Sequence, residues 1–341
     1  MKAVQLSNYD RTPEIADVAE PEAAAPLDVV VRIGGAGVCR TDLHIIEGQW
    51  AQKTGVSLPY TLGHENAGWV HAVGSAVSNV EVGDPVILHP LVTCGLCRPC
   101  RGGDDVHCEN STFPGINTDG GYAEFLRTNA RAVVKLGDSL EPAAVAALAD
   151  AGLTAYHAAR KAVAALRPGD TVVVIGSGGL GHIGVQALKA MTPAEVIVVD
   201  RSWEALGLAE LAGAEHLVNA DGTQVEAVLD LTDGHGAEAV VDFVGEGGAI
   251  EDGIAMLRRT GDYYVVGYGG TLAIPTIDII STEINFVGNL VGSYNDLEEL
   301  MTLAARGKVS LHTRTYPLTD FGKALEDLDN GQVKGRAILV P

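Results

Sequence analysis

A glycine-rich loop between an apolar strand and a helix constrains the fold of this chain more than any other feature. The run 171–175 reads TVVVI, which is typical of a buried strand, and the loop Gly176–Gly181 follows it with the sequence GSGGLG. A helical pattern begins near His182, and a second apolar run ends at Asp200. The spacing G-x-G-x-x-G is a weak signal alone, but a strand, this loop, a helix and a second strand in that order are what a dinucleotide-binding fold requires.

Each position of the loop has a physical reason. Gly176 permits a tight turn, Gly178 lets the backbone approach a pyrophosphate, and Gly181 allows the helix to pack closely on the strand. The helix N-terminus supplies free N–H groups and a partial positive charge for phosphates. Asp200 would accept hydrogen bonds from ribose hydroxyls and repel a 2′-phosphate, which favours NAD over NADP, whereas the adjacent Arg201 would suit that phosphate. The expected coenzyme contacts are Gly176, Gly178, Gly179, Leu180, Gly181, Asp200 and Arg201.

The pattern along the chain predicts two domains, as a length of 341 residues also suggests. The first 150 or so residues read as short β-branched runs bounded by glycine or proline, which is typical of strands and turns. Beyond them, strands alternate with helices, and the alternation predicts a parallel sheet covered on both faces. The predicted helices span 182–191, 203–212, 223–232 and 247–258, and the last predicted strand of this region spans 284–292.

The charge of the chain excludes several classes of partner. The formal net charge is −21, so nucleic acid and anionic membrane surfaces are not expected to bind, because phosphate recognition needs clustered lysine and arginine. No run reaches the roughly 18 apolar residues that a membrane span needs. The first ten residues, MKAVQLSNYD, lack the apolar segment of a secretory signal. We therefore expect a cytoplasmic protein.

Four of the five cysteines lie together with the spacing C-x2-C-x2-C-x7-C. In a reducing compartment, clustered thiols indicate a metal site before they indicate disulfides. Four thiolates fill a tetrahedral zinc shell and leave no open position, so such a site is structural. An iron–sulfur centre is the alternative, and the spacing does not decide against it. His107, next to the last cysteine, is either a spare ligand or a solvated loop residue. The four cysteines are Cys94, Cys97, Cys100 and Cys108.

Further motifs carry a resemblance to a known family. Cys39 lies in GVCRTDLH, His64 lies in a G-H-E-x2-G-x5-G run over 63–74, and GGYAEF spans 120–125. A lone cysteine and a lone histidine are ordinarily core residues. Together with the four-cysteine lobe, however, these motifs resemble the zinc-containing medium-chain dehydrogenase/reductase family, specifically its alcohol dehydrogenases, over nearly the whole chain. The resemblance implies an α/β fold, with a GroES-like strand-rich catalytic domain and a Rossmann doubly wound parallel sheet.

The resemblance implies NAD and two zinc ions per chain, one structural in the four-cysteine lobe and one catalytic. Cys39 and His64 match two ligands of the catalytic zinc. Asp150, in LADAGLTAYH, occupies the third ligand position, where many members have cysteine and some bacterial secondary-alcohol dehydrogenases have aspartate. A helix cap is the other interpretation of Asp150. Glu65 resembles a carboxylate that in some members moves onto the zinc, and Asp42 resembles the one that orients the imidazole of His64.

The resemblance also implies the reaction, a reversible hydride transfer between a primary or secondary alcohol and NAD. An alcohol held on zinc becomes more acidic because Zn²⁺ stabilises the alkoxide. In the family its proton leaves through a hydroxyl at the Thr41 position, the nicotinamide ribose and a histidine at the His44 position, whose ordinary pKa suits that exit. An ordinary surface histidine is the alternative for His44. Arg40 and Arg336 resemble pyrophosphate contacts, and Val266 is a further expected coenzyme contact.

The substrate is predicted with less detail. Trp50, Leu91 and Leu290 are the candidate pocket walls, and their apolar character suits hydrophobic alcohols, ketones or aldehydes over sugars. A polyol or amino-alcohol dehydrogenase on the same scaffold is the alternative enzyme. A zinc-stabilised nucleotide-binding protein without turnover is the alternative of another class, although such a protein has no use for a proton relay.

The expected domain boundaries follow from these assignments. Residues 1–151 and 292–341 would form the GroES-like catalytic domain, with the structural zinc lobe at about 91–110. Residues 152–291 would form the inserted Rossmann domain. The chain length resembles that of bacterial and archaeal tetramers in the family, so we expect a homotetramer.

Overall fold

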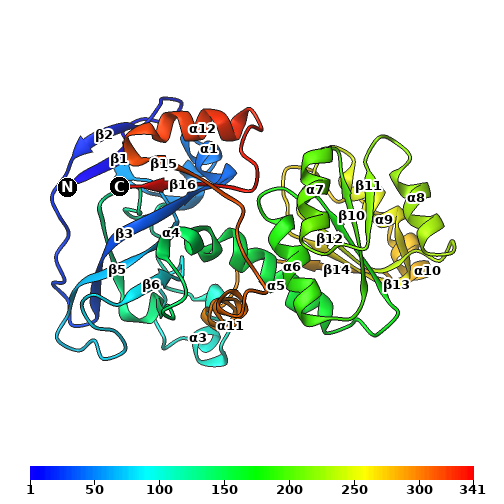
Figure 1. Cartoon of the computed structure of the whole chain (residues 1–341), viewed down its shortest axis with the longest axis horizontal. Helices are drawn as coiled ribbons and strands as arrows, with labels where there is room; N and C mark the ends of the chain where they lie inside the picture. Colours follow the sequence, from blue (N-terminus) through cyan, green and yellow to red (C-terminus); the bar gives the residue numbers. More distant parts are fainter. The chain divides into compact units, whose positions relative to one another are not determined.

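The computed structural model describes residues 1–341, and the chain divides into two compact units (Figure 1). The second unit comprises Gly152–Gly292 and Arg306–Val309. The first unit comprises three segments, Met1–Ala151, Ser293–Ala305 and Ser310–Pro341, so both ends of the chain lie in it.

The second unit is built on a six-stranded sheet in which all neighbouring strands are parallel. Its order, β11-β10-β9-β12-β13-β14, places the first strand in the centre and builds each half outward from it. Val172, Val173 and Val174 of β9 are fully buried, as a strand covered on both faces requires. The predicted doubly wound parallel sheet is confirmed. The strands are β9 (Thr171–Ile175), β10 (Glu195–Asp200), β11 (His216–Asn219), β12 (Ala237–Asp242), β13 (Leu257–Val265) and β14 (Asn285–Gly288).

Helices flank this sheet on both sides (Figure 1). The helix α6 packs on β9, β10 and the helix α7, while α8 and α9 pack on one another and on other strands. None of the helices in the structure combines the length and the apolar character needed to span a lipid bilayer. The helices of the second unit are α5 (Ala151–Val163), α6 (Gly181–Met191), α7 (Trp203–Leu211), α8 (Gln224–Leu231), α9 (Ala249–Ala255) and α10 (Thr276–Thr282).

Two predicted elements are shorter in the structure than in the sequence prediction. The helix expected at 247–258 ends at Ala255, because Leu257 already pairs with Ala237 as the first residue of β13. The strand expected at 284–292 ends at Gly288. There the Asn289 side chain donates to two carbonyl oxygens of the sheet, and Val291 adopts a positive φ of 48°, which extended strands do not allow.

The first unit contains two sheets. The larger has seven strands in the order β15-β16-β3-β5-β6-β8, with β7 paired to β3, and the smaller has the order β2-β1-β4. All their strand pairs are antiparallel except β15 with β16. The strands are β1 (Lys2–Leu6), β2 (Glu14–Asp17), β3 (Asp28–Val38), β4 (Tyr60–Thr61), β5 (Glu65–Val73), β6 (Pro85–Leu88), β7 (Phe125–Asn129), β8 (Val133–Lys135), β15 (Thr313–Pro317) and β16 (Arg336–Val340).

The long strand β3 carries the chain to the candidate site. Its pairing with β5 shifts register twice, and its sequence DVVVRIGGAGV has three buried valines at its start and a run of small buried residues near its end. At Gly35 an added Cβ would lie 2.8 Å from the backbone of Ala143, so only glycine lets the helix α4 (Pro142–Val145) approach the strand this closely. The strand ends at Val38, and Cys39 follows it directly.

A buried carboxylate in this unit makes its stability depend on pH. The Asp327 side chain, on α12 (Phe321–Asp329), is 4% exposed and accepts a hydrogen bond from the Tyr316 hydroxyl at 2.8 Å. Arg314 and Lys323 each form an ion pair with it at 3.2 Å. These contacts, the Tyr316 hydrogen bond foremost, hold the pKa of Asp327 below its ordinary value. Because the folded-state pKa lies below the unfolded value of about 4, the stabilisation is present above that pH and is lost as pH falls through the folded-state pKa.

We therefore expect Asp327→Asn to lower the free energy of unfolding near neutral pH, and this deficit to shrink as pH falls from about 5 to about 2. Denaturant unfolding of both proteins across that range measures it. Asp329→Asn, which removes an exposed charge from the same helix, is the matched control and should change little. A deficit of equal size at every pH would contradict the role of the Asp327 charge.

Candidate functional site

Four potential metal ligands converge in the first unit. Cys39, His64, Glu65 and Asp150 each offer one ligand atom, and these atoms all lie within 4.8 Å of one another. The first three are buried, and the Asp150 side chain is 16% exposed, so Asp150 is the most accessible member. The structure thus brings together the three residues expected to hold the catalytic zinc, with Glu65 beside them.

Each of these residues lies where a regular element begins or ends. Cys39 is the N-cap of the helix α1 (Arg40–Ile46), and His64 immediately precedes β5. Asp150 interrupts the helical run between the 3-10 turn η3 (Ala146–Ala149) and α5, with φ −129° and ψ −59°. Side chains at such ends project away from the ladders of backbone hydrogen bonds, which lets three distant segments present them to one point.

The surroundings of the His64 ring show whether the site suits a metal. Its Nδ1 lies 3.3 Å from Asp42 Oδ1 and its Nε2 lies 3.5 Å from Asp150 Oδ2, yet both nitrogens are buried without a well-formed hydrogen bond. Burial alone would lower the pKa of His64, but Asp42 and Asp150 raise it well above its ordinary value. The surroundings therefore favour a positive charge at this ring. Nitrogen, thiolate and carboxylate donors are the set that zinc accepts, so the residues fit a zinc ion.

Glu65 is held on two sides. Its Oε1 accepts the Ala151 N–H at 3.0 Å, and its Oε2 forms an ion pair with the buried guanidinium of Arg336. Burial raises the pKa of Glu65, and the Arg336 charge opposes that shift. An added Cβ at Gly37 would lie 1.9 Å from Glu65 Oε2, so glycine at this position makes room for the carboxylate. Because Arg336 is engaged here, its expected pyrophosphate contact stays a prediction.

The residues expected to relay the proton lie on α1. Thr41 and His44 are half-buried and three positions apart, so they share one face of the helix. Arg40, the first residue of the helix, is exposed. The proposed relay and the coenzyme contact of Arg40 remain predictions, but the helix brings all three residues within two turns of Cys39.

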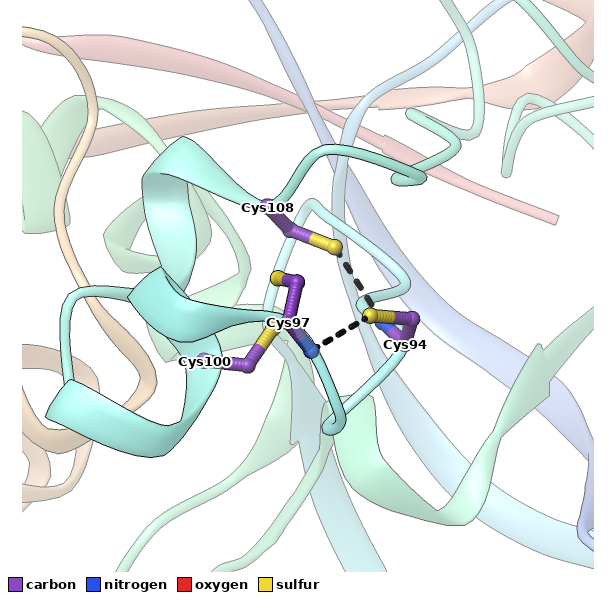
Figure 2. A group of neighbouring side chains, drawn as sticks. All are labelled: Cys94, Cys97, Cys100 and Cys108. Carbon is purple, nitrogen blue, oxygen red and sulfur yellow. Dashed lines mark hydrogen bonds between the residues drawn. The ribbon is translucent and has the colours of Figure 1, made fainter.

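The four cysteines converge in a separate lobe of the first unit. Figure 2 shows their side chains turned toward one another from the loop before the helix α3 (Arg98–Gly102), from α3 itself and from the end of the 3-10 turn η1 (Asp105–His107). Their sulfur atoms lie within 4.8 Å of one another, and none forms a disulfide. Backbone N–H groups point at the sulfurs, with Cys94 N–H to Cys108 Sγ at 3.2 Å and Cys97 N–H to Cys94 Sγ at 3.4 Å.

The electrostatics of the lobe suit bound zinc. The N–H groups of Leu96 and Cys97 lower the pKa of Cys94 to about 6, while burial and the neighbouring thiols raise the pKa of Cys100 to about 12. Four thiols this close cannot all ionise unless a cation neutralises them, and Zn²⁺ does so. The His107 imidazole is 57% exposed and lies 3.9 Å from Asp104, so the structure places it outside the cluster.

The glycine loop of the second unit has the geometry expected of it. Gly176 has a φ of +84°, and a Cβ there would lie 2.6 Å from the Val244 side chain. A Cβ at Gly181 would lie 1.8 Å from the Gly176 carbonyl oxygen. Gly178, in contrast, is exposed and has open space on its Cβ side, which is where a pyrophosphate could approach. Gly179 and Leu180 complete the loop and are half-buried.

Asp200, the last residue of β10, bonds to this loop through its carboxylate. Its Oδ2 accepts the Ser177 N–H at 2.7 Å and its Oδ1 accepts the Ser202 N–H at 2.8 Å. Arg201 Nη2 donates to the Gly247 carbonyl oxygen at 2.7 Å, a contact that the sequence did not suggest. The guanidinium that would suit a 2′-phosphate is therefore tied to the loop after β12.

A buried carboxylate that the sequence analysis missed organises that loop. Asp242 Oδ1 accepts the N–H groups of Val244 and Gly245, and its Oδ2 accepts the Tyr263 hydroxyl at 2.6 Å. The N–H of Val266, an expected coenzyme contact, donates to the Asp242 carbonyl oxygen at 3.0 Å. The only available signal was an aspartate at the end of an apolar run, at the edge where open α/β sheets bind ligands.

The three expected pocket residues differ in their surroundings. Leu91 is buried in the first unit, and Trp50 is half-buried, packs against the core of that unit and carries Lys53 over its ring at 5.4 Å. Leu290 belongs to the second unit and is 56% exposed. Their role as pocket walls stays a prediction.

Two family profiles match this chain. Residues 25–138 match the family described as "Alcohol dehydrogenase GroES-like domain", and residues 179–306 match the one described as "Zinc-binding dehydrogenase". The first match covers Cys39, His64 and the four-cysteine lobe, and the second begins within the glycine loop.

Full-length relatives carry related names. An NAD-dependent alcohol dehydrogenase from Sulfurisphaera tokodaii is 36% identical over the whole of both chains. A D-arabinose 1-dehydrogenase (NADP(+)) from Saccharolobus solfataricus is also 36% identical, covering 100% of this chain and 97% of the relative. The crystal structure of the alcohol dehydrogenase from Aeropyrum pernix is similar with a TM-score of 0.96 and 49% identity, covering both chains completely.

Proposed function

This chain belongs to the zinc-dependent medium-chain dehydrogenase/reductase family of alcohol dehydrogenases, and we propose that it catalyses reversible hydride transfer between an alcohol carbon and NAD. One observation carries the proposal. The ligand atoms of Cys39, His64 and Asp150 lie within 4.8 Å of one another, and the buried His64 ring has no hydrogen bond at either nitrogen. Cys39 caps the helix that bears Thr41 and His44.

The residues divide the work as follows. Cys39, His64 and Asp150 would hold the catalytic zinc, which when bound supplies a Lewis acid at the reacting oxygen. The hydroxyl oxygen of Thr41 would accept the alcohol proton while the same hydroxyl gives up its own, and the His44 imidazole would release a proton to solvent. Asp42 keeps the His64 ring in place, because metal-bound imidazoles need a partner at the second nitrogen.

The metal content distinguishes this function from its alternatives. We propose two zinc ions per chain, with the structural one held by the four cysteines. Elemental analysis of the purified protein should find about two zinc ions per chain, whereas a non-catalytic nucleotide-binding protein with only the cysteine site would hold one. We further propose a homotetramer, in which the first unit is the GroES-like catalytic domain and the second is the NAD domain.

The substrate we propose is an apolar secondary or aromatic alcohol, with the corresponding ketone or aldehyde in reverse. Trp50 and Leu91 are the apolar residues of the first unit that support it. A polyol or sugar substrate is the second candidate, and the similarity to a D-arabinose 1-dehydrogenase is the observation that favours it. Primary, secondary, aromatic and polyhydroxylated alcohols, each tested with NAD and with NADP, would separate these cases through the absorbance of the reduced nicotinamide.

The outcomes of that assay differ in what they overturn. Turnover of apolar alcohols with NAD supports both the reaction and the substrate class. Turnover of polyols alone keeps the reaction and rejects the apolar pocket. An absence of turnover with every alcohol, in protein that carries its full zinc, rejects the enzymatic function.

Coenzyme choice gives a separate prediction. Asp200→Asn should lower kcat/KM for NAD roughly tenfold to a hundredfold, because a hydrogen bond to a charged group contributes about 1.5–3 kcal/mol, and it should raise the NADP to NAD ratio by removing the negative charge. Steady-state kinetics with both coenzymes measure this change. Asp230→Asn removes an exposed charge from the same unit and should leave the ratio unchanged. A wild-type preference for NADP would show that Asp200 does not exclude the phosphate.

A further inference from the structure

Three side chains in close contact lead from the candidate zinc ligand His64 into the core, and one hydrogen bond joins the two farther from the site. The Tyr122 hydroxyl donates to Asp42 Oδ2 at 2.7 Å, and Asp42 Oδ1 lies 3.3 Å from His64 Nδ1. Both Tyr122 and Asp42 are 0% exposed. Burial raises the pKa of Tyr122 well above its ordinary value, and the Asp42 charge adds to the shift, so the hydroxyl keeps its proton and acts as a donor.

Asp42 links two of the candidate ligands. Besides facing the His64 ring, its carboxylate accepts the backbone N–H of Cys39 at 2.9 Å, on the same oxygen that Tyr122 contacts. A fully buried carboxylate is costly unless several donors satisfy it. The Tyr122 hydroxyl is one of these donors, and the other carboxylate oxygen faces the His64 ring at 3.3 Å.

The position of Tyr122 is itself tightly determined. Its N–H donates to the Leu62 carbonyl oxygen at 2.8 Å, and the Gly121 N–H donates to the Gly63 carbonyl oxygen at 2.8 Å. This segment therefore runs beside the residues that precede His64. An added Cβ at Gly63 would lie 2.3 Å from the Tyr122 ring. The ring therefore fills a slot that only glycine leaves open, and it packs against the segment that immediately precedes His64.

The hydroxyl has a second acceptor within reach, the Gly37 carbonyl oxygen at 3.0 Å. The carboxylate is the stronger acceptor, since it is charged and its contact is shorter. We propose that Tyr122 is a positioning residue for the catalytic zinc: it fixes the Asp42 carboxylate so that His64 is held ready for the metal. The inference rests on the proposed function, because it takes Cys39, His64 and Asp150 as the zinc ligands.

The proposal predicts a change in metal retention. In Tyr122→Phe the ring still fills its slot, but Asp42 Oδ2 keeps only the Cys39 N–H. The carboxylate is then free to rotate and the His64 ring is less restrained. Loss of the partners that orient a metal ligand typically costs tenfold to a hundredfold in affinity. Because Tyr122 acts through Asp42, we expect zinc to leave the catalytic site about tenfold faster.

The test follows zinc release from the intact protein to an excess of chelator, with a coloured zinc indicator. The phase that belongs to the catalytic site is identified as the one missing in Cys39→Ser, and the remaining phase belongs to the four-cysteine lobe. Tyr60→Phe is the matched control, because the Tyr60 hydroxyl is also buried in this unit but makes no hydrogen bond. Tyr263→Phe removes the analogous hydroxyl-to-carboxylate bond with Asp242 in the second unit.

The expected result is a faster catalytic-site phase in Tyr122→Phe alone, with an unchanged phase from the cysteine lobe. A release rate equal to that of Tyr60→Phe would overturn the proposal, and so would an equal acceleration of both phases, which indicates general loosening of the core. If wild-type protein lacked the phase that Cys39→Ser should remove, the ligand assignment itself would be wrong and the proposed function would fail first.

Discussion

Cys39→Ser is expected to lower kcat by about three orders of magnitude or more while the protein stays folded. A metal ion that acts as a Lewis acid contributes several kcal/mol to transition-state stabilisation, and each 1.36 kcal/mol corresponds to tenfold in rate. The Cys39 thiol is one of four donors at the site, and its side chain also belongs to the capping box of α1. Its removal should therefore cost the catalytic zinc, and with it nearly all of the turnover.

The fold should survive this change for local reasons. Cys39 is the N-cap of α1, and serine is among the best residues at that position. The backbone N–H of residue 39, which donates to Asp42 Oδ2 at 2.9 Å, remains in the serine variant. The change is also small in volume, so the surrounding core keeps its packing.

Three measurements on one preparation would check this prediction. The kcat should fall, the zinc content should fall from about two to about one per chain, and the midpoint of thermal unfolding should move by only a few degrees. Full activity in Cys39→Ser would show that Cys39 is not a ligand. Lost activity with two zinc ions still bound would assign the loss to some cause other than the metal.

Much of the fold could be predicted from the sequence because its signals are local. The apolar run before Gly176, the glycine spacing and the acid at Asp200 all fall within one strand–helix–strand segment, so the pattern predicts the parallel sheet directly. The spacing of the four cysteines is likewise local, and it indicated a metal lobe without reference to any distant residue.

The contacts that could not be predicted join residues far apart in the chain. Glu65 and Arg336 are separated by 271 positions, and Tyr122 and Asp42 by 80. No periodicity or spacing brings such residues together, because their proximity follows from how the strands pair. For this reason GGYAEF was useful as a motif, while the role of its tyrosine became visible only in the structure.

The second large effect is expected in the cysteine lobe, where Cys97→Ser should lower the midpoint of thermal unfolding by about 10 °C. Structural zinc contributes its binding free energy to folding, with apparent values of about 10–16 kcal/mol in small zinc domains. The loss of even about 4 kcal/mol is enough, since each kcal/mol moves the midpoint by roughly 2–4 °C in domains of 150–250 residues.

The effect should reach beyond the lobe. Asp105 Oδ1 accepts the N–H of Tyr294, the first residue of the helix α11 (Tyr294–Ala305), at 3.0 Å, and the Tyr294 hydroxyl donates to the Val133 carbonyl oxygen at 3.1 Å. A lobe without zinc would no longer hold Asp105 in place. The start of α11, which joins the first unit after the chain has completed most of the second, would then lose a buried partner.

Scanning calorimetry and zinc analysis of Cys97→Ser would measure this, with Leu96→Ser as the matched control in the same loop. Leu96 is 73% exposed, so its replacement should change stability by no more than about 0.5 kcal/mol. The Cys39 site does not depend on the lobe for any ligand, so kcat per folded molecule should persist in Cys97→Ser well below the unfolding transition. Together the two cysteine variants therefore separate the two metals: one loses turnover and keeps its stability, and the other loses stability and keeps its turnover. If Cys97→Ser unfolded at the wild-type temperature with one zinc missing, the zinc in the lobe would not contribute to the stability of the fold. Asp105 would then hold α11 without the metal.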